Sequence, residues 1–303
     1  MAGDAGRRGS ADCPAAAGLH RLRRASRRLS FSEVPLHPDA GNPDRSRLQS
    51  RIWDPEVETW LNQIDVQPGW QCVDLGCGAM GILEPLSRRS VPTGRVIGVE
   101  PRPAMLLAAR EFVARTKLEN VRLLDTSPDR TTLPDESFHL VHERFLLSAG
   151  GNEQALLQEM LRLTRPGGIV GFQEPDLSSS SCYPDRAEWK RLRDAVRTSF
   201  SAGGADLDSG SRTFGLLRRA GLEDVRIRAA ALALQGAHPA KRFLVDLAEQ
   251  HRERILASGA IDEDALEETL AECEGIAADP ETVVVSFLMS QVWGRKPKGR
   301  WAR

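Results

Sequence analysis

Three glycines and one acid form the group of residues with the clearest chemical meaning. Gly76, Gly78 and Gly81 lie in the run VDLGCGAMG and satisfy the spacing GxGxxG. Glu100 stands 19 residues after Gly81, at the end of the next apolar run. Glycines allow a ligand to approach the backbone at a strand-to-helix turn, and an acid after the second strand can accept both hydroxyls of a ribose. The pattern therefore predicts a nucleoside-containing ligand.

Asp74, two residues before the first glycine, narrows the choice of nucleoside. A carboxylate beside the loop would attract a cationic amino-acid head group, whereas it would repel the pyrophosphate of a dinucleotide. An NAD-dependent oxidoreductase would use the same glycines and the same Glu100, so that alternative stays open. The position of Asp74 makes the oxidoreductase the weaker of the two alternatives.

A second group of polar residues follows two later strands of the predicted sheet. His142 and Arg144 come at the end of a strand over 138–142, and Glu174 follows a strand over 169–173. This is the edge at which open α/β sheets bind ligands. His142 is the first candidate for a general base, because an imidazole titrates near neutral pH, and Glu174 is the second. Arg144 could orient a carboxylate or phenolate acceptor, although each of the three could equally be a structural ion-pair partner.

The elements that must position these residues alternate between strands and helices. Strands are predicted over 71–75, 95–99, 121–124, 138–142 and 169–173, and helices over 80–89, 103–118 and 153–163. Such alternation implies βαβ crossovers and a parallel, doubly wound sheet. In the last third, strands are predicted over 225–234 and 282–293, and helices over 186–200, 241–256 and 262–276.

Several segments together resemble a known family. The runs VDLGCG, VIGVEP, SFHLV and LTRPGGIVGFQEPD occur in the order typical of class I S-adenosylmethionine (SAM) methyltransferases. More closely, the chain resembles bacterial small-molecule methyltransferases of the methyltransferase-11/UbiE-like group. The resemblance implies a Rossmann-like α/β fold, in which a seven-stranded sheet has an antiparallel last strand and late insertions form a helical cap.

The resemblance also implies SAM as the cofactor and assigns its contacts. The loop after the first strand would cradle the methionine part, Glu100 would bind the ribose, and Ser127-Pro128 would stand at the adenine. The implied cofactor-binding set is Asp74, Gly76, Cys77, Gly78, Glu100, Pro101, Ser127, Pro128 and His142, and the catalytic set is His142, Glu174 and Arg144.

The function implied in this way is methyl transfer from SAM to an O, N or C atom of a small molecule, with a secondary metabolite as the expected acceptor. A SAM-binding protein that catalyses a non-methylating step, such as a cyclisation, is the alternative. Methylation of nucleic acid is not expected. The Asn/Asp-Pro-Pro-aromatic run of amino-directed enzymes is replaced by His142-Glu-Arg-Phe, and no cysteine lies between Cys77 and Cys182 to serve a cytosine-C5 enzyme. No metal is expected, because the carboxylates after the fourth and fifth strands show no recognisable metal spacing.

Composition sets the remaining expectations. The 303 residues carry 41 Lys and Arg against 42 Asp and Glu, so the net charge of −1 gives no reason to expect nucleic acid or a membrane as partner. The sequence contains five cysteines without a CxxC pair, which favours the reducing cytoplasm. The chain has 36 arginines against 5 lysines, which suggests GC-rich coding, and so a bacterial source is expected. The expected partner is a small-molecule acceptor, with homodimerisation left open.

The chain is expected to divide into four segments. Residues 1–42 form an Arg-rich extension that is predicted to be disordered, and residues 43–180 form the SAM-binding core. Residues 181–295 supply cap helices and the last two strands, and residues 296–303 form a loose basic tail.

Overall fold

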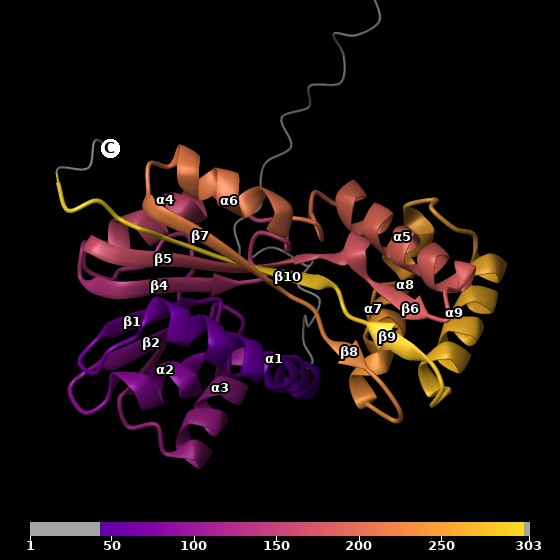
Figure 1. Cartoon of the computed structure of the whole chain (residues 1–303), viewed down its shortest axis with the longest axis horizontal. Coiled ribbons are helices and arrows are strands. Elements are labelled where there is room, and N and C mark those ends of the chain that lie inside the picture. Colours follow the sequence, from indigo (N-terminus) through magenta and orange to yellow (C-terminus); the bar gives the residue numbers. More distant parts are fainter. Residues whose placement is uncertain (1–42, 300–303) are drawn as a thin grey trace, which may run out of the picture.

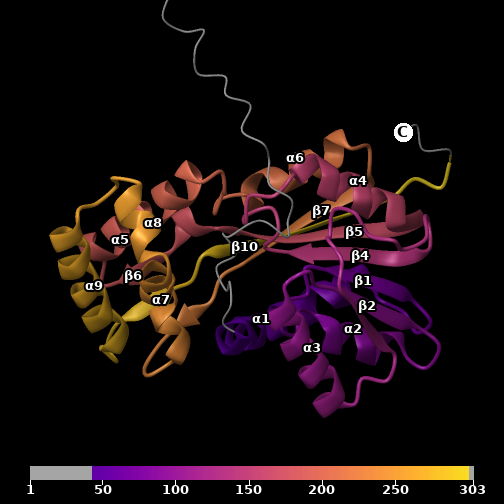
Figure 2. The ribbon, with the colours of Figure 1, turned by 180° about the vertical axis from the view of Figure 1, so that it is seen from behind.

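The computed structural model of the protein describes residues 43–299. These residues form a sheet-centred core and a smaller cap, which lie side by side along the long axis of the molecule (Figure 1). The view from behind shows the same division, with helix α1 (Pro43–Ile64) between the core and the cap (Figure 2). The predicted extension 1–42 lies outside the described residues.

The core is built on a seven-stranded sheet with the order β3-β2-β1-β4-β5-β10-β7. Strands β1 to β5 pair in parallel, and β10 runs antiparallel to both β5 and β7. The predicted sheet with an antiparallel last strand is therefore confirmed. The strands are β1 (Gln71–Leu75), β2 (Arg95–Val99), β3 (Val121–Leu124), β4 (Phe138–Arg144), β5 (Thr164–Asp176), β7 (Glu223–Ala230) and β10 (Leu288–Arg295).

The register of the parallel strands brings the predicted site residues to one edge of the sheet. Asp74 of β1 pairs with Gly98 on one side and with His142 on the other. Glu100 follows β2 directly, and its backbone N–H donates to Leu124 O at 3.0 Å. Three neighbouring strands thus end beside one another, which is the ligand-binding edge of an open α/β sheet.

Helices cover both faces of this sheet (Figure 1). Trp60 and Phe112 lie in the buried apolar cluster on one face, whereas Leu156 and Leu217 lie in the cluster on the other. Burial of these apolar stripes is the main force that holds the helices on the sheet. The first face carries α1, α2 (Leu83–Ser90) and α3 (Pro103–Thr116), and the second carries α4 (Glu153–Leu163) and α6 (Gly210–Arg219).

The cap combines helices with a small antiparallel sheet of order β6-β9-β8. It has a core of its own, in which Trp189 and Phe200 are fully buried. Its elements are two short 3-10 helices (Leu177–Ser179 and Pro239–Arg242), β6 (Ser181–Tyr183), α5 (Ala187–Ala202), β8 (Ala233–Leu234), α7 (Phe243–Gln250), α8 (Arg252–Ala257), α9 (Glu263–Ala278) and β9 (Val283–Val285).

Two segments cross from the core sheet into the cap. A single strand was predicted over 225–234 and another over 282–293, and both predictions are wrong, because each segment forms two strands in different sheets. The first segment forms β7 in the core sheet and β8 in the cap sheet, and the second forms β9 in the cap sheet and β10 in the core sheet. Hydrogen bonds join the two segments where they pass from one sheet to the other. Ser286 N donates to Leu232 O and Leu232 N donates to Ser286 Oγ, both at 2.9 Å. The apolar alternation continues through the break at Phe287 without a glycine or proline, so the sequence carries no signal for it.

The predicted loose tail from residue 296 needs a correction at its first residue. Lys296 is buried, and its Nζ donates to Leu161 O at 2.9 Å and to Thr164 O at 2.8 Å. It also forms an ion pair with Glu136 at 3.0 Å. The ammonium group thereby satisfies the carbonyls where α4 passes into β5, which fastens the end of β10 to the core.

Candidate active site

The glycine loop after β1 is packed tightly on one side and covered only by side chains on the other. Gly76 and Gly78 have φ angles of +67° and +57°, a region that favours glycine. A Cβ on Gly76 would lie 2.6 Å from Leu146 Cδ2. A Cβ on Gly78 would lie 3.2 Å from Ser46 Oγ and 4.0 Å from Arg102 Nη2. Among the described residues, these two side chains are the nearest cover over the outer face of the loop.

Glu100 is the polar centre of this loop. Its side chain is fully buried, and its carboxylate accepts hydrogen bonds from Gly78 N and from Arg102 N, both at 2.9 Å. The Arg102 guanidinium binds the same carboxylate through Nε at 2.8 Å and Nη2 at 2.9 Å. The predicted ribose-binding acid is therefore present at the end of β2, and in this structure Arg102 neutralises it.

Asp74 and His142 form a hydrogen-bonded pair across β1 and β4. Asp74 Oδ1 lies 2.7 Å from His142 Nδ1, and Asp74 Oδ2 accepts a hydrogen bond from Ile82 N at 3.0 Å. Both side chains are buried, and the His142 ring lies 5.1 Å from the Trp60 ring. Since a carboxylate can only accept, Nδ1 carries the ring proton and Nε2 bears the lone pair.

The environment of His142 favours the neutral ring. Burial lowers the pKa of His142, the hydrogen bond and charge of Asp74 oppose this shift, and the charge of Arg144 adds to it. Within residues 43–299, His142 Nε2 has no hydrogen-bond partner. A neutral imidazole with a fixed tautomer and a bare Nε2 is the form that can accept a proton.

Glu143 and Glu174 form a buried carboxyl pair on the neighbouring ends of β4 and β5. Burial is the largest cause that raises the pKa of each, and the charge of Glu174 raises the pKa of Glu143 further. Glu143 Oε1 has no hydrogen-bond partner among the described residues. Burial and the nearby charge of Glu174 therefore favour the protonated form of Glu143.

This carboxyl pair fixes the turn 145–148 that follows β4. Leu146 N donates to Glu143 Oε2 at 2.9 Å, and Leu147 N donates to Glu174 Oε1 at 2.9 Å. Glu174 Oε2 accepts from Ser148 N at 3.0 Å and from Ser209 Oγ at 2.6 Å. Both oxygens of Glu174, the second candidate base, are thus occupied by groups that hold the turn in place.

Arg144 lies beneath α1. It is buried, and its Nη2 donates to Ser50 Oγ at 2.7 Å. Its guanidinium lies 5.7 Å from the centre of the Phe145 ring. The pKa of Asp54 on α1 is raised by burial, and the positive charge of Arg144 opposes that shift. The predicted acceptor-orienting arginine is therefore engaged with the helix that covers the sheet edge.

Further polar atoms between α1 and the sheet have no hydrogen-bond partner among the described residues. Gln173 lies in register with Arg144 on β5, and both atoms of its amide are unpartnered. The indole N–H groups of Trp53 and Trp60 on α1 are unpartnered as well. Buried polar atoms normally bind protein, water or ligand, so this group marks a place where a small molecule or water is expected.

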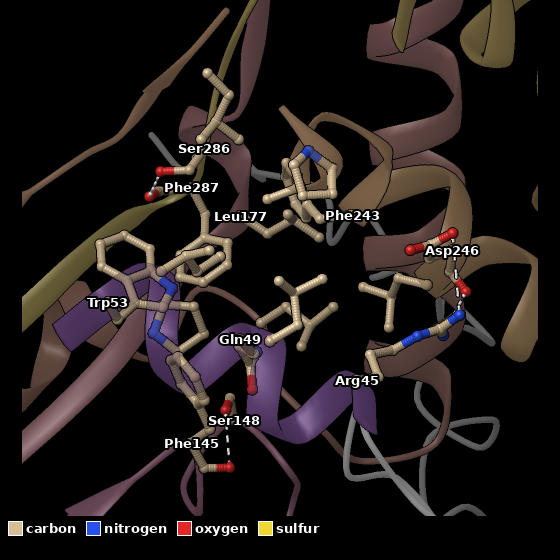
Figure 3. A pocket seen from close by; sticks show the side chains of 18 residues that line it. Arg45, Gln49, Trp53, Phe145, Ser148, Leu177, Phe243, Asp246, Ser286 and Phe287 are labelled. Atoms are coloured by element: carbon tan, nitrogen blue, oxygen red, sulfur yellow. Dashed lines mark hydrogen bonds and ion pairs between the residues drawn. The ribbon is translucent and has the colours of Figure 1, made fainter. Parts of the chain in front are cut away.

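A mainly apolar cavity lies where α1, the turn 145–148 and the cap meet (Figure 3). Its volume is ≈ 100 Å³. Trp53 belongs both to its wall and to the group of unpartnered atoms beneath α1. The cavity is lined by Arg45, Leu48, Gln49, Ile52, Trp53, Phe145, Ser148, Pro175, Leu177, Leu207, Leu234, Pro239, Ala240, Phe243, Asp246, Leu247, Ser286 and Phe287.

The other predicted cofactor-binding residues lie on the same sheet edge. Cys77 is buried, its backbone N donates to Val99 O at 3.0 Å, and burial raises the pKa of its thiol well above the ordinary range. Pro101 follows Glu100 at the start of the connection to α3. Ser127 and Pro128 come after β3, which pairs with β2, and Ser127 Oγ donates to Asp129 Oδ1 at 2.5 Å.

The side chains that pack over this edge of the sheet were not predicted from the sequence. Arg102 is two residues after Glu100, and that spacing was the one signal for their ion pair. The pairing of Glu143 with Glu174 could have been suspected, because both end neighbouring strands. The cavity walls come from many separate segments and carry no motif.

Residues 43–299 lack two further features. In that part of the chain no group of three or more His, Cys, Asp or Glu side chains is arranged to hold a metal ion. The helices of the same residues include none that is both long and apolar enough to cross a membrane.

The glycine loop and the end of β4 lie within one segment that matches a known family. Residues 72–168 match the family model described as a methyltransferase domain. Demethylmenaquinone methyltransferase from Geobacillus stearothermophilus is 30% identical over 140 residues, which are 46% of this chain and 58% of that protein. Arsenite methyltransferase from Halobacterium salinarum is 31% identical over 118 residues, which are 39% of this chain and 30% of that protein. The matches therefore span 58% of the first relative and 30% of the second.

Solved structures share the fold over a longer part of the chain. Phosphoethanolamine N-methyltransferase 2 from Haemonchus contortus superposes with a TM-score of 0.56 at 16% identity, over 89% of this chain and 60% of that one. The YcgJ protein from Bacillus subtilis superposes with a TM-score of 0.51 at 14% identity, over 79% and 97%. Residues 72–168 are therefore a class I SAM-dependent methyltransferase domain, distantly homologous to the UbiE-type demethylmenaquinone methyltransferases.

Proposed function

We propose that this chain transfers the methyl group of SAM to a nucleophilic O, N or C atom of a small molecule, with a secondary metabolite as the acceptor. The observation that carries the proposal is the meeting of three features at one sheet edge. These are the glycine loop, the buried Glu100 at the end of β2 and the Asp74–His142 pair. The methyltransferase domain that contains all three supports it.

The residues at this edge suit SAM as the cofactor. The outer face of Gly78 is covered by side chains that can move, and Glu100 offers a carboxylate directly beneath it. For Glu100 to accept the ribose hydroxyls, the Arg102 guanidinium has to leave, and its side chain is 21% exposed. The backbone of Gly76, Cys77 and Gly78 would hold the methionine part, and Pro101, Ser127 and Pro128 would border the adenine.

Asp74 has a second role in this proposal besides the predicted contact with the cofactor. Its Oδ1 faces His142 Nδ1 and its Oδ2 accepts from Ile82 N, and each oxygen keeps a further lone pair for the ammonium of the cofactor. Asp74 also fixes the tautomer of His142, which makes it a positioning residue. Its negative charge remains beside the glycine loop, so it still disfavours a pyrophosphate.

The chemistry requires alignment of the acceptor and, for an O–H or N–H acceptor, removal of one proton. The sulfonium of SAM supplies an electrophilic methyl carbon, so that transfer breaks the S–CH3 bond, forms the acceptor–CH3 bond and leaves the electron pair on sulfur. His142 Nε2 takes the proton that the acceptor loses. Glu174 holds the turn 145–148 and Arg144 holds α1, so both position the site without taking part in proton transfer.

The core and the cap would have different roles in binding. The core, within residues 43–180, would bind the cofactor, and the cap, within residues 181–295, would close over the acceptor, although α6 of the latter segment packs on the core sheet. Cys72, Cys77, Cys182 and Cys273 are buried free thiols, which supports a reducing, cytoplasmic location.

The test uses SAM that carries an isotopically labelled methyl group. Purified protein is incubated with labelled SAM and a small-molecule extract of the producing cells, and mass spectrometry follows the label. The expected result is a labelled product that the His142→Ala variant forms at least about 100-fold more slowly. A new product without label, formed in the presence of SAM, would contradict methyl transfer and favour the non-methylating alternative.

A further inference from the structure

The cavity between α1 and the cap is placed to receive an acceptor. It lies at the carboxyl ends of β4 and β5, where Phe145 and Ser148 belong to the turn that follows β4. The same turn sends Leu146 over the glycine loop at Gly76. One short turn therefore touches the cofactor loop on one side and lines the cavity on the other.

Aromatic rings form one side of this cavity (Figure 3). The Phe287 ring lies at the break between β9 and β10 and is the centre of the group. Its centroid is 5.2 Å from that of Trp53, 5.8 Å from that of Phe145 and 5.9 Å from that of Phe243. Edge and tilted contacts of this kind leave ring faces and edges available to a further flat ring.

The charged groups in the wall are already paired. Arg45 lies 4.0 Å from the Asp246 carboxylate, and its Nη1 donates to Asp246 O at 2.9 Å and to Gln250 Oε1 at 2.6 Å. Asp246 also binds Arg242 at 3.2 Å. A phosphate or an ammonium on the acceptor would find its counter-charge already neutralised within the protein.

The two serines of the wall are engaged in the same way. Ser148 Oγ donates to Phe145 O at 3.1 Å, and Ser286 Oγ donates to Phe287 O at 2.9 Å. Most of the remaining lining is aliphatic or aromatic. Trp53 Nε1 and His142 Nε2 are two polar atoms that lack a hydrogen-bond partner within the described residues. Trp53 is a residue of the wall, and His142 belongs to β4, three residues before Phe145 of the wall.

From these observations, and resting on the proposed function, we infer that the acceptor is an uncharged molecule whose body is a flat, apolar ring system, aromatic or similar. The ring body packs among Trp53, Phe145, Phe243 and Phe287. Its nucleophilic atom faces the polar group beneath α1 that includes His142 Nε2. The cavity volume of ≈ 100 Å³ is of the order of an apolar cavity of about 150 Å³ that admits benzene, so there is room for about one ring of the acceptor.

The test places a charge in the wall without disturbing the core. Leu48 lines the cavity from α1 and is 37% exposed, so glutamate is tolerated there by the fold. Leu107 on α3 is 59% exposed and does not line the cavity, so Leu107→Glu is the matched control. The probe is N-phenyl-1-naphthylamine, an uncharged aryl naphthyl compound that becomes fluorescent in apolar surroundings. Binding of S-adenosylhomocysteine and thermal unfolding are measured on the same samples.

The expected result is saturable probe binding to the wild-type protein and to Leu107→Glu, and at least about tenfold weaker binding to Leu48→Glu. Phosphoethanolamine, as a charged competitor, is expected to leave the bound probe in place. Equal probe affinity in the two glutamate variants, or displacement of the probe by phosphoethanolamine, would overturn the inference. Probe binding that responds to Leu48→Glu in a protein unable to bind S-adenosylhomocysteine would overturn the proposed function and leave the apolar site standing.

Discussion

Replacement of Asp74 by asparagine tests how the structure prepares His142 for proton transfer. In Asp74→Asn, the amide oxygen can still accept the hydrogen bond from Ile82 N, which reaches Asp74 Oδ2 at 3.0 Å in the wild-type protein. The amide NH2 then faces His142 Nδ1, at the position where the carboxylate lies 2.7 Å away. Two donors cannot face each other, so the ring proton has to move from Nδ1 to Nε2.

The magnitude follows from the loss of one charge-assisted hydrogen bond. Such bonds contribute about 1.5–3 kcal/mol, against about 0.5–1.5 kcal/mol for neutral ones, so Asp74→Asn should lower the free energy of unfolding by about 1 kcal/mol. The effect on catalysis should be larger. A base whose lone pair is lost at Nε2 gives up a contribution of about 100- to 10,000-fold in the rate of methyl transfer.

The tautomer can be measured before any acceptor is known. Long-range ¹H–¹⁵N correlation spectra distinguish protonated from bare ring nitrogens, and we expect Nδ1–H in the wild-type protein and Nε2–H in Asp74→Asn. Asp185→Asn is the control, because Asp185 pairs with Lys190 on the surface. If His142 carries its proton on Nε2 in the wild-type protein, or keeps Nδ1–H in the variant, the assignment of Asp74 as a positioning residue is refuted.

Three further predictions concern Arg102 and two buried titratable sites. Arg102→Met should tighten S-adenosylhomocysteine binding by about tenfold, because Glu100 loses the guanidinium that competes with the ligand. The same change should lower the free energy of unfolding by about 1–3 kcal/mol. Weaker binding of S-adenosylhomocysteine, measured by calorimetry, would show that Arg102 assists the ligand instead. The pKa of Glu143 is raised well above its ordinary value by burial and by Glu174, so its contribution to stability is present below about pH 4.5 and is lost as the pH rises through its folded-state pKa. Denaturant titrations across pH should show this loss of stability with rising pH in the wild-type protein and a flatter profile in Glu143→Gln. Identical profiles would argue against a protonated Glu143. Burial lowers the pKa of His251 to about 4, so the contribution of this neutral histidine to stability is present above pH 6.5 and is lost as the pH falls towards 4. The His251→Gln variant should therefore lose less stability than the wild-type protein as the pH falls over this range. An equal loss of stability in the two proteins would contradict the lowered pKa of His251.

The part of the fold that could be predicted from the sequence is the part with a strong local signal. Strands β1, β2 and β3 were predicted with their observed bounds, because short apolar runs lie between clear turn residues. The same local logic failed over 282–293, where the chain changes sheet within a continuous apolar segment. What divides that strand is its hydrogen bonding with the neighbouring crossing at Leu232, which is a tertiary effect.

The candidate site likewise has a part that the sequence could predict and a part that it could not. Topology alone brings Asp74, Glu100 and His142 to one edge, since parallel strands end together. The partners of these groups depend on side-chain packing, and so the sequence did not indicate that Asp74 binds His142. For the ion pair of Arg102 with Glu100 it offered only the short spacing between them. The acceptor cavity was beyond prediction for the same reason, because its rings come from α1, the turn after β4, the cap and the β9–β10 break.

The most direct measurement for the central claim is a calorimetric titration of the wild-type protein with SAM, S-adenosylhomocysteine and NADH. SAM and its demethylated product should bind more tightly than about 1 mM, whereas NADH should not. Glu100→Gln should weaken both SAM ligands by about tenfold, corresponding to about 1.4 kcal/mol, while Glu111→Gln on the exposed side of α3 should not. Binding of NADH in a protein that binds neither SAM nor its product would contradict the account.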